Sequence, residues 1–140
     1  MFKKIKGKSL TEYWPKTASV TITISGTLLA PDGSGAATVA TASALRLLGS
    51  SLVSVASTDA DFASNTRIPV EVPLDDCEFE ADVTGTLTTA MIGELRGLTA
   101  SGTVVDATNT TNDQVTITKF ISATKCHCKL NEAYQYADGA

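Results

Sequence analysis

The residues best suited to chemistry lie close together near the end of the chain, at Cys126, His127 and Cys128. Thiolates and imidazole are common zinc ligands, and a Cys-His pair can also form a nucleophilic site. In an extended strand, successive side chains point to opposite faces, so the two thiols share one face and His127 takes the other. Three adjacent strand residues do not close on one metal ion, so we expect buried free thiols. Metal binding, and a disulfide from Cys77 to either thiol, are the less favoured alternatives.

Other residue types do not complete a reaction centre. His127 is the only histidine, and no residue near it in the sequence forms an oriented acid-base pair. Glu78, Glu80 and Asp82 alternate along one expected strand, which is typical of a solvated face rather than of the opposed carboxylates of a glycosidase. No glycine-rich phosphate loop is present. The sequence therefore predicts a protein that is not an enzyme, with no catalytic, cofactor-binding or metal-binding residues.

The stretch from Arg67 to Asn131 organises the chain, because apolar and polar residues alternate in almost every part of it. This pattern predicts half-buried antiparallel strands, including strands at Gln114–Ile121 and Lys125–Leu130. One expected strand has an inward face made of Cys77, Phe79, Ala81 and Val83. The fold class predicted is all-β: a small antiparallel β-barrel or a two-layer β-sandwich with an extended N-terminal arm.

Several shorter segments carry separate expectations. Val20–Ser25 reads as a strand, and Pro69 and Pro73 predict that the strand between them lies at a sheet edge. Ala42–Ala56 has leucines at helical spacing, but its central Gly-Ser-Ser favours two short strands around a turn. Thr88–Met91 is expected to form one helical turn.

The first sixteen residues are expected to form an arm, followed by a β-rich domain at 17–131 and a C-terminal tail at 132–140. The arm is rich in lysine, and the chain's only tryptophan lies in it. Such a basic arm suggests contact with an acidic partner, with a solvated, frayed terminus as the alternative. Trp14 either anchors on a partner subunit or folds back on its own domain. The candidate partner-contact residues are Phe2, Lys3, Lys4, Lys6, Tyr13 and Trp14.

Composition limits the class of protein. The chain has 140 residues, of which 43% are hydrophobic and 19% charged, as expected for one globular domain. Its formal net charge of −4 disfavours nucleic-acid binding. No apolar run is long enough for a membrane helix, and no signal peptide is visible. Three cysteines fit folding in a reducing cytoplasm.

Read from end to end, the chain resembles the small head-decoration (capsid cement) proteins of tailed bacteriophages. The resemblance covers about residues 7–131. The stretches that carry it are GKSLTEYWPKTA, DADFASNTRIPVEVP, ADVTGTLTTAMIGELRGL and KFISATKCHCKLN. The Cys-His-Cys triplet departs from the alternating Val/Lys strand that this family would lead one to expect.

The resemblance implies a virion structural protein, made in the host cytoplasm, that binds the outer surface of the phage head and stabilises the shell. Its partners would be the major capsid protein and other copies of itself, as a homotrimer, with neither nucleic acid nor membrane involved. The family supplies no catalytic residues. Two alternatives stay open: another virion part, such as a tail-tube or baseplate component, and a small cytoplasmic β-barrel binding module.

Overall fold

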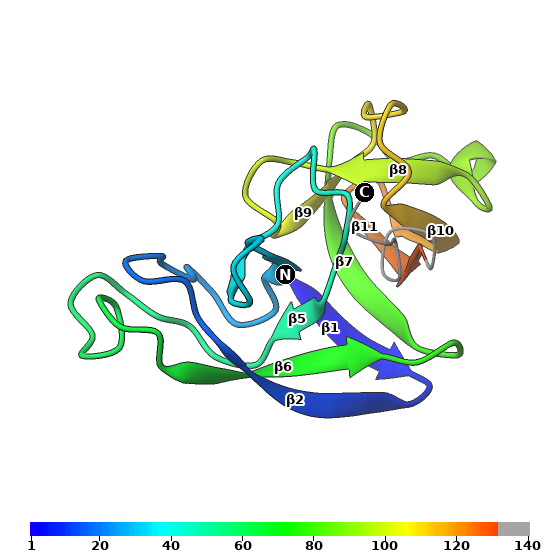
Figure 1. Ribbon diagram of the computed structural model, residues 1–140. Helices are drawn as coiled ribbons and strands as arrows, with labels where there is room; N and C mark the ends of the chain where they lie inside the picture. The colour runs from blue at the N-terminus through cyan, green and yellow to red at the C-terminus, as the bar shows by residue number, and fades with distance from the viewer. Residues whose placement is uncertain (132–140) are drawn as a thin grey trace.

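A computed structural model describes residues 1–131 and consists almost entirely of β-strands (Figure 1). The only helical element in this part of the chain is one 3-10 turn, Thr89–Met91, within the segment expected to be a helical turn. The eleven strands are β1 (Phe2–Lys6), β2 (Ser9–Pro15), β3 (Leu28–Pro31), β4 (Ala37–Val39), β5 (Gly49–Ser51), β6 (Arg67–Pro73), β7 (Glu78–Thr84), β8 (Leu95–Leu98), β9 (Val104–Asp106), β10 (Val115–Ser122) and β11 (Lys125–Leu130).

The first sheet has six strands in the order β1-β7-β11-β10-β8-β9. A parallel ladder between β7 and β9 closes five of them, β7, β11, β10, β8 and β9, into a barrel, and β1 is the sixth strand, paired with β7. β7 pairs with three strands: β11 along one edge, and β1 and β9 along successive parts of the other edge. Its first half pairs with β1, while Asp82, Val83 and Thr84 pair with β9. Full closure leaves few free hydrogen-bonding groups within the ring.

The barrel core follows from the alternation along its strands. Phe79 and Ala81 are buried inside the barrel, as the sequence predicts, and Cys126 and Cys128 face them from β11. Phe2 enters the same core, and its ring packs edge-on against Phe79 with 6.4 Å between centroids. Burying an aromatic ring of this size contributes about 2–3 kcal/mol. The all-β prediction, with a closed barrel as one of its two forms, is therefore confirmed.

The second sheet has the strand order β2-β6-β5-β3-β4, and all of its ladders are antiparallel. It has a small core of its own, which loops 16–27 and 52–66 help to form. The β3–β4 hairpin closes through the turn that begins at Pro31-Asp32-Gly33. The buried members of this core are Ile22, Leu29, Ala37, Val55, Ile68 and Val70.

The N-terminal segment belongs to the β-body, and the expected extended arm is not confirmed. β1 pairs with β7 in the barrel, and β2 pairs with β6 over seven residue pairs in the second sheet. The β1–β2 segment therefore runs alongside the β6–β7 segment, and both pass from one sheet to the other (Figure 1). Lys3 and Lys6, two of the lysines that suggested an exposed arm, lie on the outer side of β1, while Phe2 on its inner side is buried.

β6 corrects the expectation that its two prolines mark a sheet edge. It lies between β2 and β5. The carbonyl of Pro69 accepts a hydrogen bond from Leu52 N, so its nitrogen faces the β5 side. On that side β5 pairs only with Val70 and Glu71, so neither proline costs a ladder bond there.

Two further segments differ from their expectations. Val20–Ser25 forms no strand; Ile22 makes only an isolated bridge to Val55, with both hydrogen bonds 2.9 Å long. Within Ala42–Ala56 there is no helix, as favoured, but Gly-Ser-Ser is the strand β5 itself rather than a turn. Gly49 lies so close to the Glu71 carbonyl that any side chain would overlap it, which explains why glycine stands there. The expected tail, 132–140, lies outside the described residues.

Candidate functional site

The outer surface of the barrel carries three carboxylates from β7 between the cations of two neighbouring strands. Glu78, Glu80 and Asp82 alternate along β7 and point outward, as the sequence predicts. β1 lies on one side of them, with Lys3 opposite Glu80 and Lys6 opposite Glu78. Glu78 and Glu80 are therefore placed to meet positive charge from β1, whereas Asp82 lies beyond β1 and pairs on that edge with Val104 of β9.

β11 supplies cations on the other side. His127 is opposite Glu80, with 3.4 Å between Nε2 and Oε2. Lys125 is opposite Asp82, and its Nζ lies 3.8 Å from Asp82 and 3.7 Å from Glu80. On the β1 side, Lys6 Nζ lies 3.2 Å from Glu78. Exposed pairs of this kind each contribute only about 0–1 kcal/mol to folding, so their larger effect is on the surface potential.

Glu78 is the most enclosed of the three carboxylates. Thr118 Oγ1 donates to it at 2.6 Å, and Lys6 lies beside it. These contacts, with the Thr118 hydrogen bond the largest, hold the pKa of Glu78 below its ordinary value. Glu78 therefore stays ionised at neutral pH and suits the role of a fixed charge.

The three thiols lie inside the barrel and not on its charged surface. Cys77, Cys126 and Cys128 are all buried and free, and His127 points to the opposite face from its neighbours, as expected. The hydrogen bond with Cys126, followed by burial, raises the pKa of Cys128. Among residues 1–131, no three His, Cys, Asp or Glu side chains are grouped to hold a metal ion.

Burial also raises the pKa of the Cys77 thiol, from 9.0 to about 11. The unfolded chain ionises first as the pH rises, so this contribution to stability is complete below pH 9 and is lost as the pH passes through 11. The full loss amounts to about 2–3 kcal/mol at 1.36 kcal/mol per pKa unit.

We expect the free energy of unfolding to fall more steeply between pH 9 and 10.5 in the wild type than in Cys77→Ala. Urea titrations under reducing conditions measure the difference. Cys77→Ala should start lower at pH 7 because it leaves a small cavity, so the slope is the relevant quantity. Parallel curves for the two proteins would contradict the assigned role of Cys77.

The six candidate contact residues do not form one surface. Phe2 is only 2% exposed and belongs to the barrel core, so it is not a contact residue of the folded protein. Lys3 and Lys6 are exposed on the outer barrel surface. Lys4 turns the other way, towards Glu71, with 3.6 Å between Nζ and Oε2.

The two aromatic residues of β2, Tyr13 and Trp14, lie in different environments. Tyr13 is 62% exposed, whereas Trp14 is half-buried against the core of the second sheet. The indole N–H of Trp14 donates to Glu12 at 3.3 Å. Of the two interpretations of Trp14, the structure therefore favours packing on its own domain.

Lys16 is a buried lysine that the sequence gives no reason to expect inside. Its Nζ donates to the carbonyls of Thr17 and Phe62 at 2.8 and 3.0 Å and lies 5.8 Å from the centre of the Phe62 ring. Burial lowers the pKa of Lys16, and Asp61 partly opposes that shift. Asn65 Nδ2 also donates to the Lys16 carbonyl, so these contacts fasten loop 57–66 to the body.

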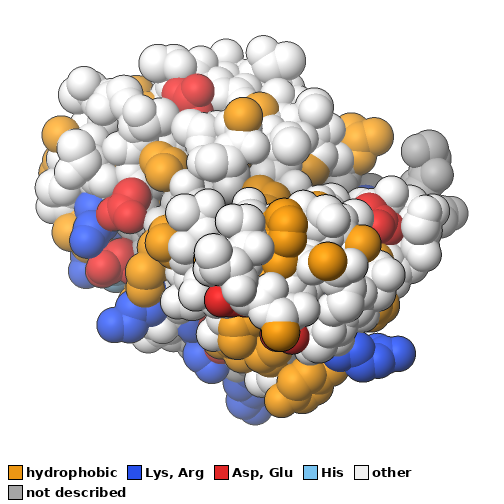
Figure 2. All heavy atoms as spheres, turned by 90° about the vertical axis from the view of Figure 1, so that its left-hand side faces the viewer, with side chains coloured by type: hydrophobic (Ala, Val, Ile, Leu, Met, Phe, Trp, Pro, Cys, Tyr) orange, Lys and Arg blue, Asp and Glu red, His pale blue; other side chains and the backbone are white. Residues whose placement is uncertain are grey.

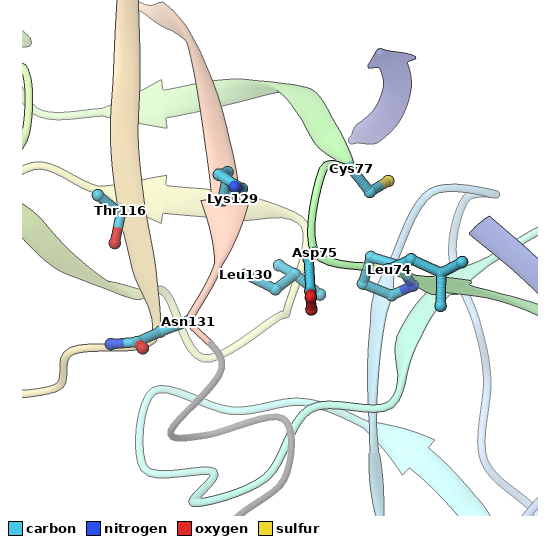
Figure 3. A pocket seen from close by; sticks show the side chains of 8 residues that line it. Leu74, Asp75, Cys77, Thr116, Lys129, Leu130 and Asn131 are labelled. Carbon is cyan, nitrogen blue, oxygen red and sulfur yellow. The ribbon is translucent and has the colours of Figure 1, made fainter. Parts of the chain in front are cut away.

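A hollow of about 220 Å³ lies between the β6–β7 turn and strands β10 and β11 (Figure 3). Asp75 and Leu74 line it from the turn, and Thr116 and Lys129 from the strands. Asn131 Nδ2 donates a hydrogen bond to the carbonyl of Asp113 at 2.7 Å. The walls combine one acid, one base and apolar side chains without a buried, unpartnered polar group, so we assign the hollow no ligand.

Sequence reasoning missed part of the charged surface. It treated the acidic residues of β7 as a solvated face and placed the N-terminal lysines on a separate arm. Lys125 and Lys129 continue the same surface, and the period of two in the stretch KCHCKL already places them on the side opposite the thiols. Lys119 is brought there by its pairing with His127, which the local pattern does not reveal.

Comparisons with models of known families, with curated proteins and with solved structures give no match to this chain. No helix within residues 1–131 has the length and apolar character needed to cross a membrane. The site must therefore be interpreted from its own geometry.

Proposed function

We propose that this chain is a structural protein of a bacteriophage particle that binds the outer surface of the head and stabilises the shell. The observation that carries the proposal is that the protein exposes extended sheet surfaces. They are the charged outer side of the barrel and the β2 strand, on which Leu10 and Tyr13 are 52% and 62% exposed. Surfaces of this kind suit contact with other polypeptides.

The sequence resemblance supports the same role, and the stretches that carry it meet in the fold. GKSLTEYWPKTA contains β2, and DADFASNTRIPVEVP contains its partner β6. ADVTGTLTTAMIGELRGL and KFISATKCHCKLN contain all or part of four neighbouring barrel strands, β7, β8, β10 and β11. The partners proposed are the major capsid protein and, within a homotrimer, other copies of this chain.

The fold changes how such a protein would hold a shell. With residues 2–15 built into the two sheets, binding would use preformed surfaces and would not require an arm to become ordered. A preformed surface loses less conformational entropy on binding. Many identical sites on a shell would add further binding strength through multivalency if the protein is trimeric.

Co-sedimentation tests the proposal. The full chain is mixed with expanded, undecorated shells assembled from the major capsid protein of the same phage genome. We expect the protein to pellet at a fixed ratio to the capsid subunit and to raise the shell's melting temperature. A protein that stays in the supernatant at every concentration and leaves the shell unchanged would refute this function, and ring formation by the protein alone would favour a tail-tube role.

A further inference from the structure

We propose that the outer side of β1, β7, β11 and β10 is the surface that docks on the shell, and that it recognises an acidic patch of the capsid protein. This inference rests on the proposed function and identifies the part of the molecule that performs it. We call this surface the basic face. Its charged residues are Lys3, Lys6, Glu78, Glu80, Asp82, Lys119, Lys125, His127 and Lys129.

Strand register arranges the basic face in rows that cross the sheet. In the middle row, Lys3 of β1 is opposite Glu80 of β7, which is opposite His127 of β11, which is opposite Lys119 of β10. Neighbouring strands lie about 4.8 Å apart, so the lysines of β1 and the cations of β11 stand about 10 Å apart. The positive groups thus form columns on both sides of the acidic column on β7.

The exposed ammonium groups flank the acidic column. The side chain of Lys6 is 71% exposed, while that of its partner Glu78 is 16% exposed. Lys125 is 43% exposed, between Glu80 at 34% and Asp82 at 51%. Lys3 and Lys119 are also exposed, so an approaching partner meets ammonium groups on both sides of the carboxylates.

The sum of charges makes this face different from the rest of the protein. Its five lysines and three carboxylates give a net charge of +2 with His127 neutral. The whole chain carries −4, so the remaining residues carry −6. Figure 2 shows another side of the molecule, where most of the surface is uncharged and charged side chains gather towards the left and lower margins. The protein therefore has a polarised charge distribution, which orients binding to an acidic surface.

The acidic column favours a protein partner over nucleic acid. A phosphate backbone laid along the face would meet Glu80 and Asp82 between the lysine columns, and the rest of the molecule would repel it. Carboxylates on a protein can instead be spaced to meet the columns separately. Lys3 and Lys119 are free for this, since both are exposed and neither has a carboxylate within ion-pair distance among residues 1–131.

Two double variants with the same net charge test the inference. Lys3→Gln with Lys119→Gln removes two positive charges from the basic face. Ser54→Asp with Ser57→Asp adds two negative charges at exposed positions in the loop after β5, so both variants have a formal charge of −6. All four positions are exposed, so both proteins should fold as the wild type does, which thermal unfolding checks.

Binding to undecorated shells is then measured at several salt concentrations. We expect the basic-face variant to bind about tenfold more weakly than the wild type in low salt, with a smaller loss on adding salt. The serine variant should bind within about twofold of the wild type, because its added charges lie away from the contact.

The outcomes separate the inference from the function on which it rests. Equal binding by the wild type and the basic-face variant would overturn the inference and leave the proposed function standing. Absence of wild-type binding to shells would overturn both. Retention of the wild type on duplex DNA, lost in the basic-face variant while shell binding is unchanged, would also overturn the inference, since it would assign the face to nucleic acid.

Discussion

Deletion of residues 1–16 is expected to abolish cooperative folding. The deletion removes β1 from the barrel and β2 from the second sheet, together with the buried side chains of Phe2 and Lys16. Loss of one buried phenylalanine alone costs about 3–5 kcal/mol. The free energy of unfolding of a domain of this size is about 5–15 kcal/mol in total, so the combined loss is expected to leave no stable folded state.

Circular dichroism during heating measures this result directly. The full chain should show one sharp transition, and chain 17–140 should show none. A truncated chain that unfolds cooperatively within a few degrees of the full chain would contradict the structure and would restore an arm that is dispensable for folding.

Two single substitutions in the same segment provide a matched comparison. Phe2→Ala is expected to lower the free energy of unfolding by about 3 kcal/mol, because it opens a cavity beside Phe79. Tyr13→Ala should change it by less than about 0.5 kcal/mol, since that ring is mostly in solvent. Similar losses for the two variants would contradict the different environments assigned to them.

The sequence was most informative where alternation alone determines the outcome. Along 77–83 and 125–130 a period of two separates inward from outward side chains, and it placed Phe79, Ala81, Cys126 and Cys128 on inner faces correctly. Such a pattern does not depend on which strand is the neighbour. For this reason the barrel core could be predicted before its topology was known.

The N-terminal segment could not be predicted in the same way. Phe2 pairs with Ala81, about 80 residues later in the chain, and no local pattern reports so distant a partner. Its lysines satisfy two interpretations, a solvated arm and the outer side of a strand, and only pairing with β7 decides between them. Lys16 was missed for a related reason: lysine is almost never fully buried unless its amine is paired. Here the partners are the carbonyl of the next residue, Thr17, and the carbonyl of Phe62 in a distant loop.

The candidate site was accordingly predicted in part. Lys3 and Lys6 were correctly placed at the surface, and the carboxylates of β7 were correctly placed outward. What the sequence could not show is that these two groups face each other across one sheet. The basic face exists because strands from both ends of the chain meet at β7.

Gly7→Ala is expected to be the most destabilising glycine substitution in the turns, because Gly7 is where the β1–β2 turn touches the β6–β7 turn. Its φ is +82°, and an added Cβ would overlap the carbonyl group of Asp76. The turns are also joined by hydrogen bonds, from Lys8 N to Asp76 Oδ1 and from Leu74 N to the carbonyl of Lys8, both 3.0 Å long. The alanine methyl must therefore push one turn away from the other.

Gly33→Ala is the matched control. Gly33 has nearly the same φ, +87°, but nothing lies within 4 Å of its added Cβ. The Gly33→Ala variant should therefore lose only about 1–2 kcal/mol of unfolding free energy, which is the cost of a left-handed backbone at a residue with a Cβ. Gly7→Ala adds to that cost the displacement of packed backbone, for a total of about 3 kcal/mol or more. Urea unfolding with an unchanged m-value measures the loss of stability in both variants. Equal midpoint shifts would show that the contact between the two turns does not hold the two sheets together.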